Sequence, residues 1–400
     1  MTPPAAPPGR RVVVIGGGIV GLAVAERVLR DDASAQVTVV EKEQDWATHQ
    51  TGRNSGVVHS GLYYPPGSRK ARWCRAGAAS LLELARTEGV PHRVTGKLVV
   101  ATADDELGRL AALEERGRGN GLAVTRLTAA QAREHEPHVA AVAALHVAET
   151  GVIDYRAVCA VLVRRLRDAG AHLLPGTEVV GGTDGPREVA LETTRGSLVA
   201  DAVVSCAGLH ADRVARLLGH QPSVRIVPFR GEYHELTPAA AHLVRGLVYP
   251  VPDPELPFLG VHLTRGVDGH VHAGPNAVLA LAREGYAWGR VDARDLAGTL
   301  GYAGFWRLAR RQARSGTAEM VRSLSHRRFA DSVRRLLPEV TDADLVPAPA
   351  GVRAQAVRPD GSLVDDFLLE RHGRVVHLLN APSPAATAAL EIARHVVASL

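Results

Sequence analysis

A glycine-rich turn between an apolar strand and a helix constrains this chain more than any other feature. The segment RVVVIGGGIVGLAVAERVLRDD, residues 11–32, opens with a continuous apolar run from Val12 to Ile15. Such a run is typical of a parallel strand that is buried on both faces. Apolar residues then recur at helical spacing until Asp31 and Asp32, and a second strand, QVTVVEK, follows. The segment therefore predicts a βαβ unit.

The glycines of this turn match a dinucleotide-binding pattern. Gly16, Gly18 and Gly21 fit GxGxxG, in which the first allows a tight turn, the second admits a pyrophosphate and the third lets the helix pack on the sheet. The positive end of the helix dipole then faces the phosphates. Glu41 ends the second strand, where a carboxylate can accept hydrogen bonds from a ribose. Together, strand, helix and acid predict a bound dinucleotide.

The next segment indicates which dinucleotide is bound. The stretch QTGRNSGVVHSGLYY, residues 50–64, follows the second strand almost at once, whereas an NAD enzyme usually continues through further βαβ units. No second glycine fingerprint follows another strand, because VVGGTDG has the wrong spacing and no helix after it. This order favours a flavoprotein that is reduced by its own substrate, without a separate NADPH domain.

The length and the order of the elements predict two lobes. Four hundred residues exceed what one hydrophobic core usually supports. Strand and helix patterns alternate through the first half, and alternating segments such as FLGVHLTR and GHVHAGP then suggest antiparallel strands. We expect an α/β protein with a Rossmann-like lobe and a mainly antiparallel-sheet plus helices substrate lobe. The first would comprise residues 10–90, 146–225 and 346–400, and the second residues 91–145 and 226–345.

Several helix ends are marked by capping residues. Ser68 and Gly89 bound one predicted helix, and Asp154 and Gly170 bound another. The arginine-rich region of residues 303–340 reads as helical, and we expect a break near Gly316.

The composition disfavours some classes of binding partner and some kinds of site. The net charge of +5 comes with arginines that are scattered rather than grouped in a basic arm, which disfavours nucleic acid. Cys74, Cys159 and Cys206 are widely spaced without a CxxC pair, so we expect buried thiols in a reducing cytoplasm and no metal site. No run approaches the ~18 apolar residues of a membrane span. Peripheral contact with a membrane stays open.

Five segments together resemble one family. IGGGIVGLAVAERVL, EKEQDWATHQTGRNSGVVHSGLYYPPGSRKARWC, PFRGEYHEL, AGVRAQAV and LLNAPSPAATAALEIA are similar to the L-2-hydroxyglutarate oxidase and dehydrogenase family, within the FAD enzymes of the D-amino-acid oxidase and glycerol-3-phosphate dehydrogenase type. The resemblance implies noncovalent FAD and oxidation of L-2-hydroxyglutarate to 2-oxoglutarate by hydride transfer to flavin N5. Electrons would pass to oxygen or to a membrane quinone, in the cytoplasm or peripherally at the inner membrane face.

The resemblance also implies where FAD is held. Residues 51–61 would line the flavin, while Val179 and Gly208 would approach the dinucleotide through their backbone. In LLNAPSPAATAAL, Ser383 is expected to cap the closing helix, whose N-terminus would stabilise reduced flavin. The expected cofactor residues are Gly16, Gly18, Gly21, Glu41, Lys42, Thr51, Asn54, Ser55, Gly56, Val179, Gly208, Ser383, Ala385 and Thr387.

A histidine is the expected proton acceptor. The resemblance would place His59 near the reacting face, and an imidazole can take the hydroxyl proton during hydride transfer. Alternatively, His59 only packs against or hydrogen-bonds the flavin edge. His262 is the second candidate for the base.

A hydroxydiacid needs cationic partners for its carboxylates. Arg230 and Arg353 lie in matching motifs and are the expected guanidinium partners, while Arg265 is a weaker candidate. Tyr249 is expected in the substrate site, although core packing is the competing explanation for it and for Tyr233 and His272. In this chain Arg53 replaces a histidine that family members often carry in QTGHNSGVIHSG, which could alter the preference for substrate or acceptor.

Three functions remain open at this point. The first is oxidation of L-2-hydroxyglutarate or another 2-hydroxyacid. The second is an amine oxidase of the same fold that acts on an amino acid or a specialised-metabolism intermediate. The third is a flavin-binding scaffold or electron carrier, against which the intact HSG and GVRAQ segments argue.

Overall fold

The first strand lies inside a mostly parallel sheet. In the computed structural model, which describes residues 9–253 and 260–400, Val12 to Ile15 are buried as their apolar run predicts. The strand pairs in parallel with both of its neighbours. The six-stranded sheet has the order β20 (Leu368–His372), β21 (Val375–Asn380), β13 (Ala202–Ser205), β1 (Arg11–Ile15), β2 (Gln36–Val40) and β9 (His172–Leu174).

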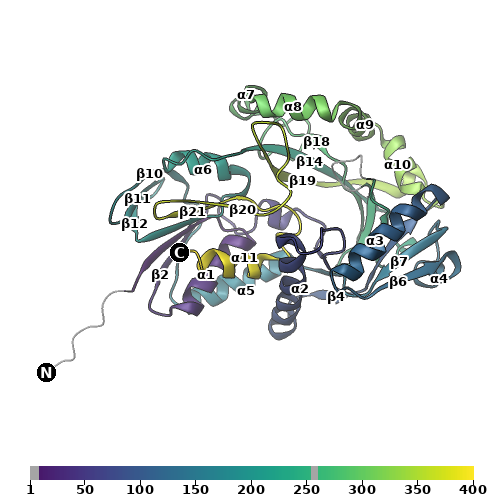
Figure 1. Ribbon diagram of the computed structural model, residues 1–400, viewed down its shortest axis with the longest axis horizontal. Helices are drawn as coiled ribbons and strands as arrows, with labels where there is room; N and C mark the ends of the chain where they lie inside the picture. Colours follow the sequence, from purple (N-terminus) through teal and green to yellow (C-terminus); the bar gives the residue numbers. More distant parts are fainter. Residues whose placement is uncertain (1–8, 254–259) are drawn as a thin grey trace.

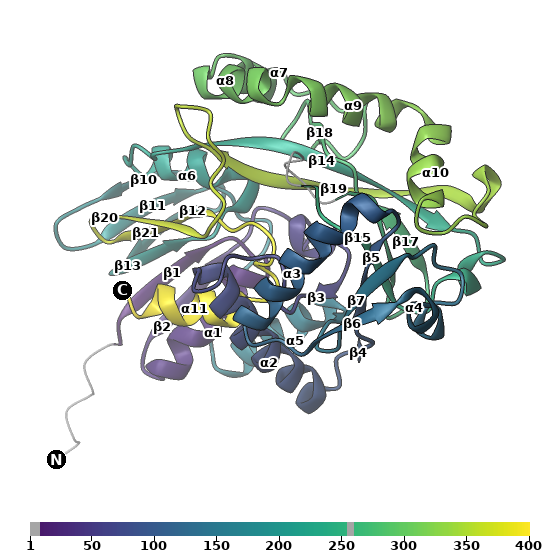
Figure 2. The same ribbon diagram turned by 45° about the vertical axis from the view of Figure 1, so that its right-hand side comes forward.

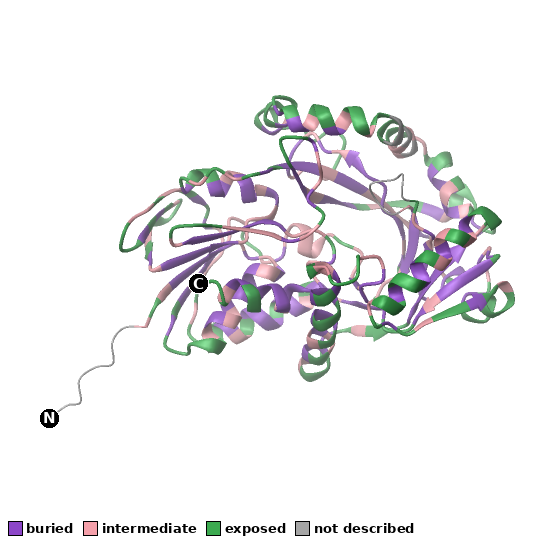
Figure 3. Cartoon of the chain, viewed as in Figure 1, coloured by how far each residue is buried: buried purple, intermediate pink, exposed green. Residues whose placement is uncertain are grey.

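Helices cover one face of this sheet and a small sheet covers the other. Four helices share a core cluster with it and lie side by side in Figure 1: α1 (Ile19–Asp31), α2 (Arg69–Glu88), α5 (Tyr155–Asp168) and α11 (Ala389–Val397). The opposite face packs on helix α6 (Ala211–Leu217) and on strands β10 (Val179–Asp184), β11 (Val189–Thr193) and β12 (Gly196–Ala200). Figure 3 shows the strands between these layers as buried.

The second lobe is built on a nine-stranded sheet. Its order is β18 (Val278–Leu279), β14 (Arg225–Leu236), β17 (Val271–Gly274), β16 (His262–Arg265), β15 (Leu247–Pro250), β5 (Lys97–Ala101), β7 (Ala143–Val147) and β6 (Val124–Thr128), with β19 (Leu345–Val357) paired to β14. All described pairs are antiparallel except β15 with β5. The predicted fold class is thus confirmed. The first two residues of FLGVHLTR lie outside the described residues.

Strand β5 illustrates why this sheet is buried on both faces. Leu98 and Val100 belong to a cluster with helix α10 (His326–Arg334), whereas Val99 and Ala101 belong to another cluster with helix α3 (Leu107–Gly119). The remaining described elements are helices α3 (Leu107–Gly119), α4 (Ala129–His135), α7 (Ala293–Leu300), α8 (Ala303–Arg311), α9 (Ala313–Leu324) and α10 (His326–Arg334), strands β3 (Val57–Val58), β4 (His92–Val94) and β8 (Gly151–Ile153), and the short 3₁₀ turns Gln50–Gly52, Asp104–Glu106, Gly208–His210, Ala241–Leu243 and Asp342–Asp344. Figure 2 shows α8, α7 and α9 along the upper edge of the molecule.

Helix ends confirm some predictions and correct one. Ser68 accepts a hydrogen bond from the N–H of Ala71, and Gly89 ends α2 at a φ of 69°. The break expected near Gly316 lies four residues earlier, at Gln312, because the N–H of Gly316 itself donates to the carbonyl of Gln312 at 2.8 Å inside α9. A glycine in an exposed helix costs only ~1 kcal/mol, which the neighbouring turns can absorb. The interruptions lie at Gln312 and at Ser325, which caps α10.

The predicted boundary at residue 346 falls one strand too early. Strand β19 pairs with β14 from Leu345 opposite Leu236 to Val357 opposite Arg225, so it belongs to the second sheet. The chain returns to the first sheet only at β20. Among the described residues, no helix combines the length and apolar character needed to cross a bilayer.

A buried histidine of the first sheet makes stability depend on pH. His377, on β21, is 0% exposed, and neither of its ring nitrogens has a hydrogen-bond partner among the described residues. Burial lowers its pKa to about 4, and the neighbouring His220 and His372 contribute to this shift. In the unfolded chain the pKa is ~6.5, so between these values the unfolded chain binds more protons and stability falls as pH falls.

We therefore expect His377→Leu to lose less stability than the parent when the pH is lowered from 7 to 5. The difference should be about 2 kcal/mol in the free energy of unfolding, measured with urea on the FAD-loaded protein. The exposed His172 provides the control, and His172→Leu should follow the parent. Equal losses for the parent and both variants would contradict this assignment.

Candidate functional site

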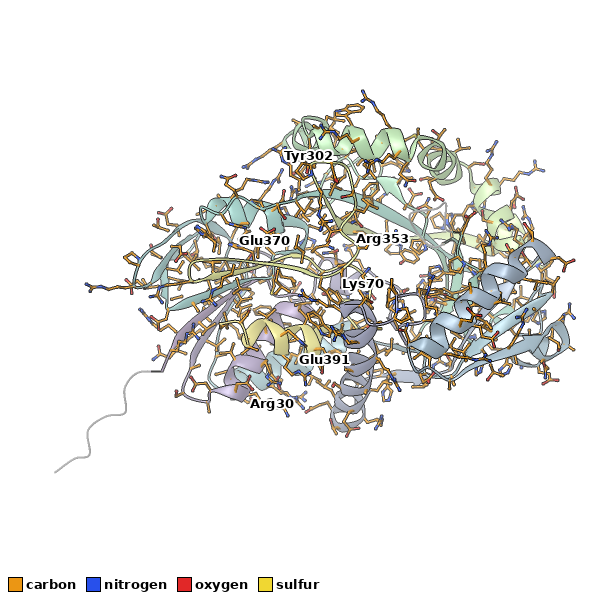
Figure 4. The ribbon with its side chains drawn as sticks, in the orientation of Figure 1. Arg30, Lys70, Tyr302, Arg353, Glu370 and Glu391 are labelled. Atoms are coloured by element: carbon orange, nitrogen blue, oxygen red, sulfur yellow. The ribbon has the colours of Figure 1, made fainter. Side chains whose placement is uncertain are left out.

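A cavity of about 590 Å³ lies where the two lobes meet, within the range of small-molecule and cofactor sites. Its walls come from the start of α1, the segment 50–64, strands of the second sheet and the segment 378–387. Figure 4 shows Arg353 on β19 and Lys70 on α2 near the middle of the molecule, and both residues line the cavity. Segments that are far apart in sequence therefore share one site.

The glycine turn has the geometry that a pyrophosphate needs. Gly16 adopts a φ of 110°, and a Cβ at Gly21 would lie 1.9 Å from the Gly16 carbonyl oxygen. Gly18 precedes α1 without a side-chain cap and lines the cavity. Thr51 accepts a hydrogen bond from the N–H of Ile19 at 3.1 Å. The first turn of α1 thus presents backbone donors to the cavity, which fits a phosphate ligand.

Glu41 and Lys42 lie at the end of β2, outside the cavity lining. The Glu41 carboxylate accepts hydrogen bonds from the N–H groups of Gly17 at 2.6 Å and Glu43 at 2.9 Å. Its oxygens retain lone pairs for a ribose. Lys42 forms ion pairs with Glu43 and, at 2.6 Å, with Glu284 of the second lobe.

Asn54 shapes the loop that enters the cavity. Its amide donates to the carbonyls of Gln50 and Thr51, and its Oδ1 accepts from the N–H of Gly56. Thr51, Asn54 and Ser55 line the cavity, whereas Gly56 lies just outside the lining with a φ of 69°.

Arg53, where family members often have histidine, also lines the cavity. Its guanidinium carbon lies 4.0 Å from the centroid of the Tyr286 ring, and its Nε donates to the carbonyl of Thr48 at 3.3 Å. These contacts tie the loop to the second lobe.

His59 is fixed by the C-terminal segment. Its N–H donates to Thr387 Oγ1 at 3.1 Å, and its Nε2 lies 3.3 Å from Ser383 Oγ. Enclosure lowers the pKa of His59 to about 3, and the positive charge of Lys97 adds to the effect. The imidazole is therefore neutral at physiological pH, and one of its ring nitrogens carries a free lone pair.

His262 is a second neutral imidazole on the cavity wall. Burial lowers its pKa to about 4, and its ring stacks on Tyr249 at 4.1 Å between centroids. Its Nδ1 lies 2.9 Å from the Gly260 carbonyl, which assigns the ring proton to Nδ1 and leaves Nε2 as an acceptor.

The strand register separates the two expected arginines. Arg353 pairs with Phe229 and lines the cavity, whereas Arg230 pairs with Val352, one position along, and faces the other side of the sheet. There Arg230 forms an ion pair with Glu232 at 2.9 Å and lies over the Trp288 ring. The structure therefore leaves Arg230 outside the lining, together with the weaker candidates Arg265 and His272.

The closing segment corrects one prediction. Helix α11 begins at Ala389 after Ala388, with no side-chain cap, so Ser383 does not cap it. The N–H of Ala385 donates to the Pro382 carbonyl, which completes a turn before the helix. Ser383, Ala385 and Thr387 nevertheless line the cavity, as does Gly208, whereas Val179 packs in the core beside the first sheet.

Several lining residues were missed from sequence. Gln50 accepts a hydrogen bond from the N–H of Ala354, and the Tyr155 hydroxyl contacts the Val57 carbonyl at 2.9 Å and Thr387 Oγ1 at 3.0 Å. The one signal for Tyr155 was a hydroxyl on the buried stripe of α5. Lys70 and Tyr63 carried no distinguishing pattern.

Comparisons with known proteins point to one family. The model of the DAO family, described as FAD dependent oxidoreductase, matches residues 11–399. The chain is 43% identical over 384 residues to an L-2-hydroxyglutarate dehydrogenase of Indibacter alkaliphilus, with 96% of each chain covered. It is 42% identical over 389 residues to the Escherichia coli K12 protein of that name, with 97% of this chain and 92% of that one covered.

The fold also matches solved structures. Dithionite-reduced L-alpha-glycerophosphate oxidase from Mycoplasma pneumoniae, with FAD bound, is similar at a TM-score of 0.78 and 21% sequence identity. The match covers 97% of this chain and 94% of that one.

The glycine turn gives a prediction about cofactor retention. Gly21→Ala would press a methyl group against the Gly16 carbonyl, and such overpacking costs roughly 1–3 kcal/mol. Relief of the strain displaces the turn, so we expect purified Gly21→Ala to hold much less FAD, measured as the ratio of flavin to protein absorbance. Gly298→Ala, on α7 with no atom within 4 Å of the new methyl group, should keep the parent ratio. A normal ratio in Gly21→Ala would contradict the role of the turn.

Proposed function

The chain belongs to the DAO family of FAD-dependent oxidoreductases, and from this premise we propose that it oxidises L-2-hydroxyglutarate to 2-oxoglutarate. One observation carries the proposal: a cavity at the family's cofactor turn contains both a guanidinium, Arg353, and a neutral imidazole, His59. The first suits a carboxylate and the second suits a hydroxyl proton. Relatives of about this length are named L-2-hydroxyglutarate dehydrogenase, which supports the choice of substrate.

The cofactor fits the residues that are present. Gly18 and the first turn of α1 would receive the pyrophosphate, while Thr51, Ser55, Gly208 and residues 383–387 would line the flavin. When bound, FAD supplies the two-electron acceptor of the reaction.

The side chains provide positioning and proton transfer. Arg353 would bind the carboxylate next to the reacting carbon through two N–H donors. As the C–H hydride leaves, His59 accepts the O–H proton, so that the carbon–oxygen bond becomes a carbonyl. Ser383 and Thr387 hold His59 in place through its Nε2 and its backbone N–H. His262, whose Nε2 is an acceptor, is the alternative base.

The electron acceptor in this proposal is oxygen or a membrane quinone. The described residues form no second nucleotide-binding turn of the Gly16–Gly21 kind, so a soluble nicotinamide is not our choice. A quinone acceptor would require the protein to contact the membrane surface peripherally.

Anaerobic reduction of the flavin tests the proposed substrate. The FAD-loaded protein is mixed separately with L-2-hydroxyglutarate, D-2-hydroxyglutarate and L-glutamate while flavin absorbance is followed. Rapid bleaching by the L-hydroxyacid alone is expected. Bleaching by glutamate with release of ammonia would instead identify an amine oxidase, and no bleaching by any of the three would reject the proposal. Reoxidation by oxygen or by a soluble quinone then distinguishes the acceptors.

The base assignment predicts a slow but FAD-loaded variant. His59→Ala should retain FAD and reduce the flavin roughly 10² to 10⁴ times more slowly, as expected for a lost general base. Stopped-flow absorbance measures this rate at saturating L-2-hydroxyglutarate. His262→Ala serves as the comparison, and a larger loss in that variant, with near-parent reduction in His59→Ala, would transfer the role to His262.

A further inference from the structure

Lysine is rare in this chain, and its few positions are informative. Only Lys42, Lys70 and Lys97 occur among 47 basic residues. Lys70 lines the cavity, and Lys42 joins the two lobes through Glu284. Lys97 is 2% exposed, and the proposed reaction assigns it no task.

Lys97 adjoins one part of the cavity wall through two aromatic rings. It begins β5, and its Nζ lies 4.2 Å from the centroid of the Tyr63 ring and 4.9 Å from that of Tyr249. Both tyrosines line the cavity, and Tyr249 stacks on His262. Two aromatic rings therefore separate the positive charge of Lys97 from the cavity.

This ammonium lacks a protein counter-charge among the described residues. Burial lowers the pKa of Lys97 to about 7, and the one described neighbour that opposes the shift is the thiol of Cys74, itself buried. A buried cation without an anion is costly. An anionic ligand in the adjoining cavity would offset that cost.

A second polar group in this part of the cavity wall is also unsatisfied. The hydroxyl of Tyr63 is buried and has no hydrogen-bond partner among the described residues. A buried donor without a partner costs free energy, and an incoming carboxylate can accept its hydrogen bond. The ring of Tyr63 lines the cavity and Lys97 Nζ lies against that ring, so the charge and the donor belong to the same part of the cavity wall.

We propose that Tyr63 and Lys97 recognise the second carboxylate of the substrate, remote from the reacting carbon, and so make the site selective for a dianion. Tyr63 donates a hydrogen bond to that carboxylate, and Lys97 attracts it from behind the two rings. The inference rests on the proposed function, because it adds the recognition of a dicarboxylate to the oxidation of a 2-hydroxyacid. Lys97 acts as a positioning residue, since it does not itself line the cavity.

Binding of unreactive probes tests this inference without turnover. Glutarate carries two carboxylates, and 4-carbamoylbutanoate has the same length with an amide in place of one of them. Each is titrated into the oxidised, FAD-loaded protein, and the dissociation constant is taken from the change in flavin absorbance. Lys97→Met should bind glutarate roughly tenfold or more weakly, yet keep its affinity for the monoamide within about twofold. Tyr63→Phe should change discrimination in the same direction.

The control removes a positive charge elsewhere in the same sheet. Arg126, on β6, is 43% exposed and pairs with Glu114, so Arg126→Met should bind both probes as the parent does. Equal weakening of both probes in Lys97→Met would mean a purely structural role and would overturn the inference. The inference would also be overturned if Lys97→Met discriminated between the two probes as strongly as the parent does. It would be overturned as well if the parent bound both probes equally. Failure of L-2-hydroxyglutarate to bleach the flavin would reject the proposed reaction while leaving this titration readable.

Discussion

The site depends on a close backbone contact between two segments that are 300 residues apart. A Cβ at Gly351 would lie 2.4 Å from the carbonyl oxygen of Arg53, so only glycine lets β19 approach the loop after β2 this closely. Gln50 stabilises the same contact, because its side-chain oxygen accepts a hydrogen bond from the N–H of Ala354. Because β19 also pairs along β14, this contact sets the second sheet against the dinucleotide-binding turn. Arg353 and His59 therefore face one cavity although they belong to different lobes.

The electrostatics of the cavity suit an anionic substrate that gives up a hydroxyl proton. Enclosure keeps His59 and His262 neutral, and the nearby cations Lys97 and Arg353 reinforce this effect on His262. Burial likewise lowers the pKa values of Lys97 and Arg353, because an enclosed cation loses its hydration. A dicarboxylate could place one carboxylate beside each of these two cations while leaving an imidazole free to accept the hydroxyl proton. In this proposal the buried cations bind the substrate and the neutral imidazole takes its hydroxyl proton.

Local signals in the sequence were enough for the βαβ unit and for two caps, because each depends on neighbouring residues. Ser68 accepts the N–H of Ala71, and Asp154 accepts the N–H groups of Arg156 and Ala157. The placement of Arg230 was different, since one step in the β14–β19 register decides which face of the sheet an arginine occupies, and no local pattern encodes that register. The predicted helix break near Gly316 was misplaced, and the predicted cap at Ser383 failed, for a related reason. Tertiary packing overrides the weak preferences of single residues to break or cap a helix. Lys97 looked like any basic residue until the fold placed two aromatic rings beside it.

The central claim is that one cavity between the two sheets holds the flavin and a dicarboxylate together. A crystal structure of the FAD-loaded protein with glutarate bound tests this claim most directly. The account predicts the isoalloxazine ring and glutarate in the same cavity, with one carboxylate on Arg353, the other beside Tyr63, and His59 next to the intervening carbon chain. Glutarate bound on the far face of the sheet, beside Arg230, or a flavin lying outside the cavity would contradict it.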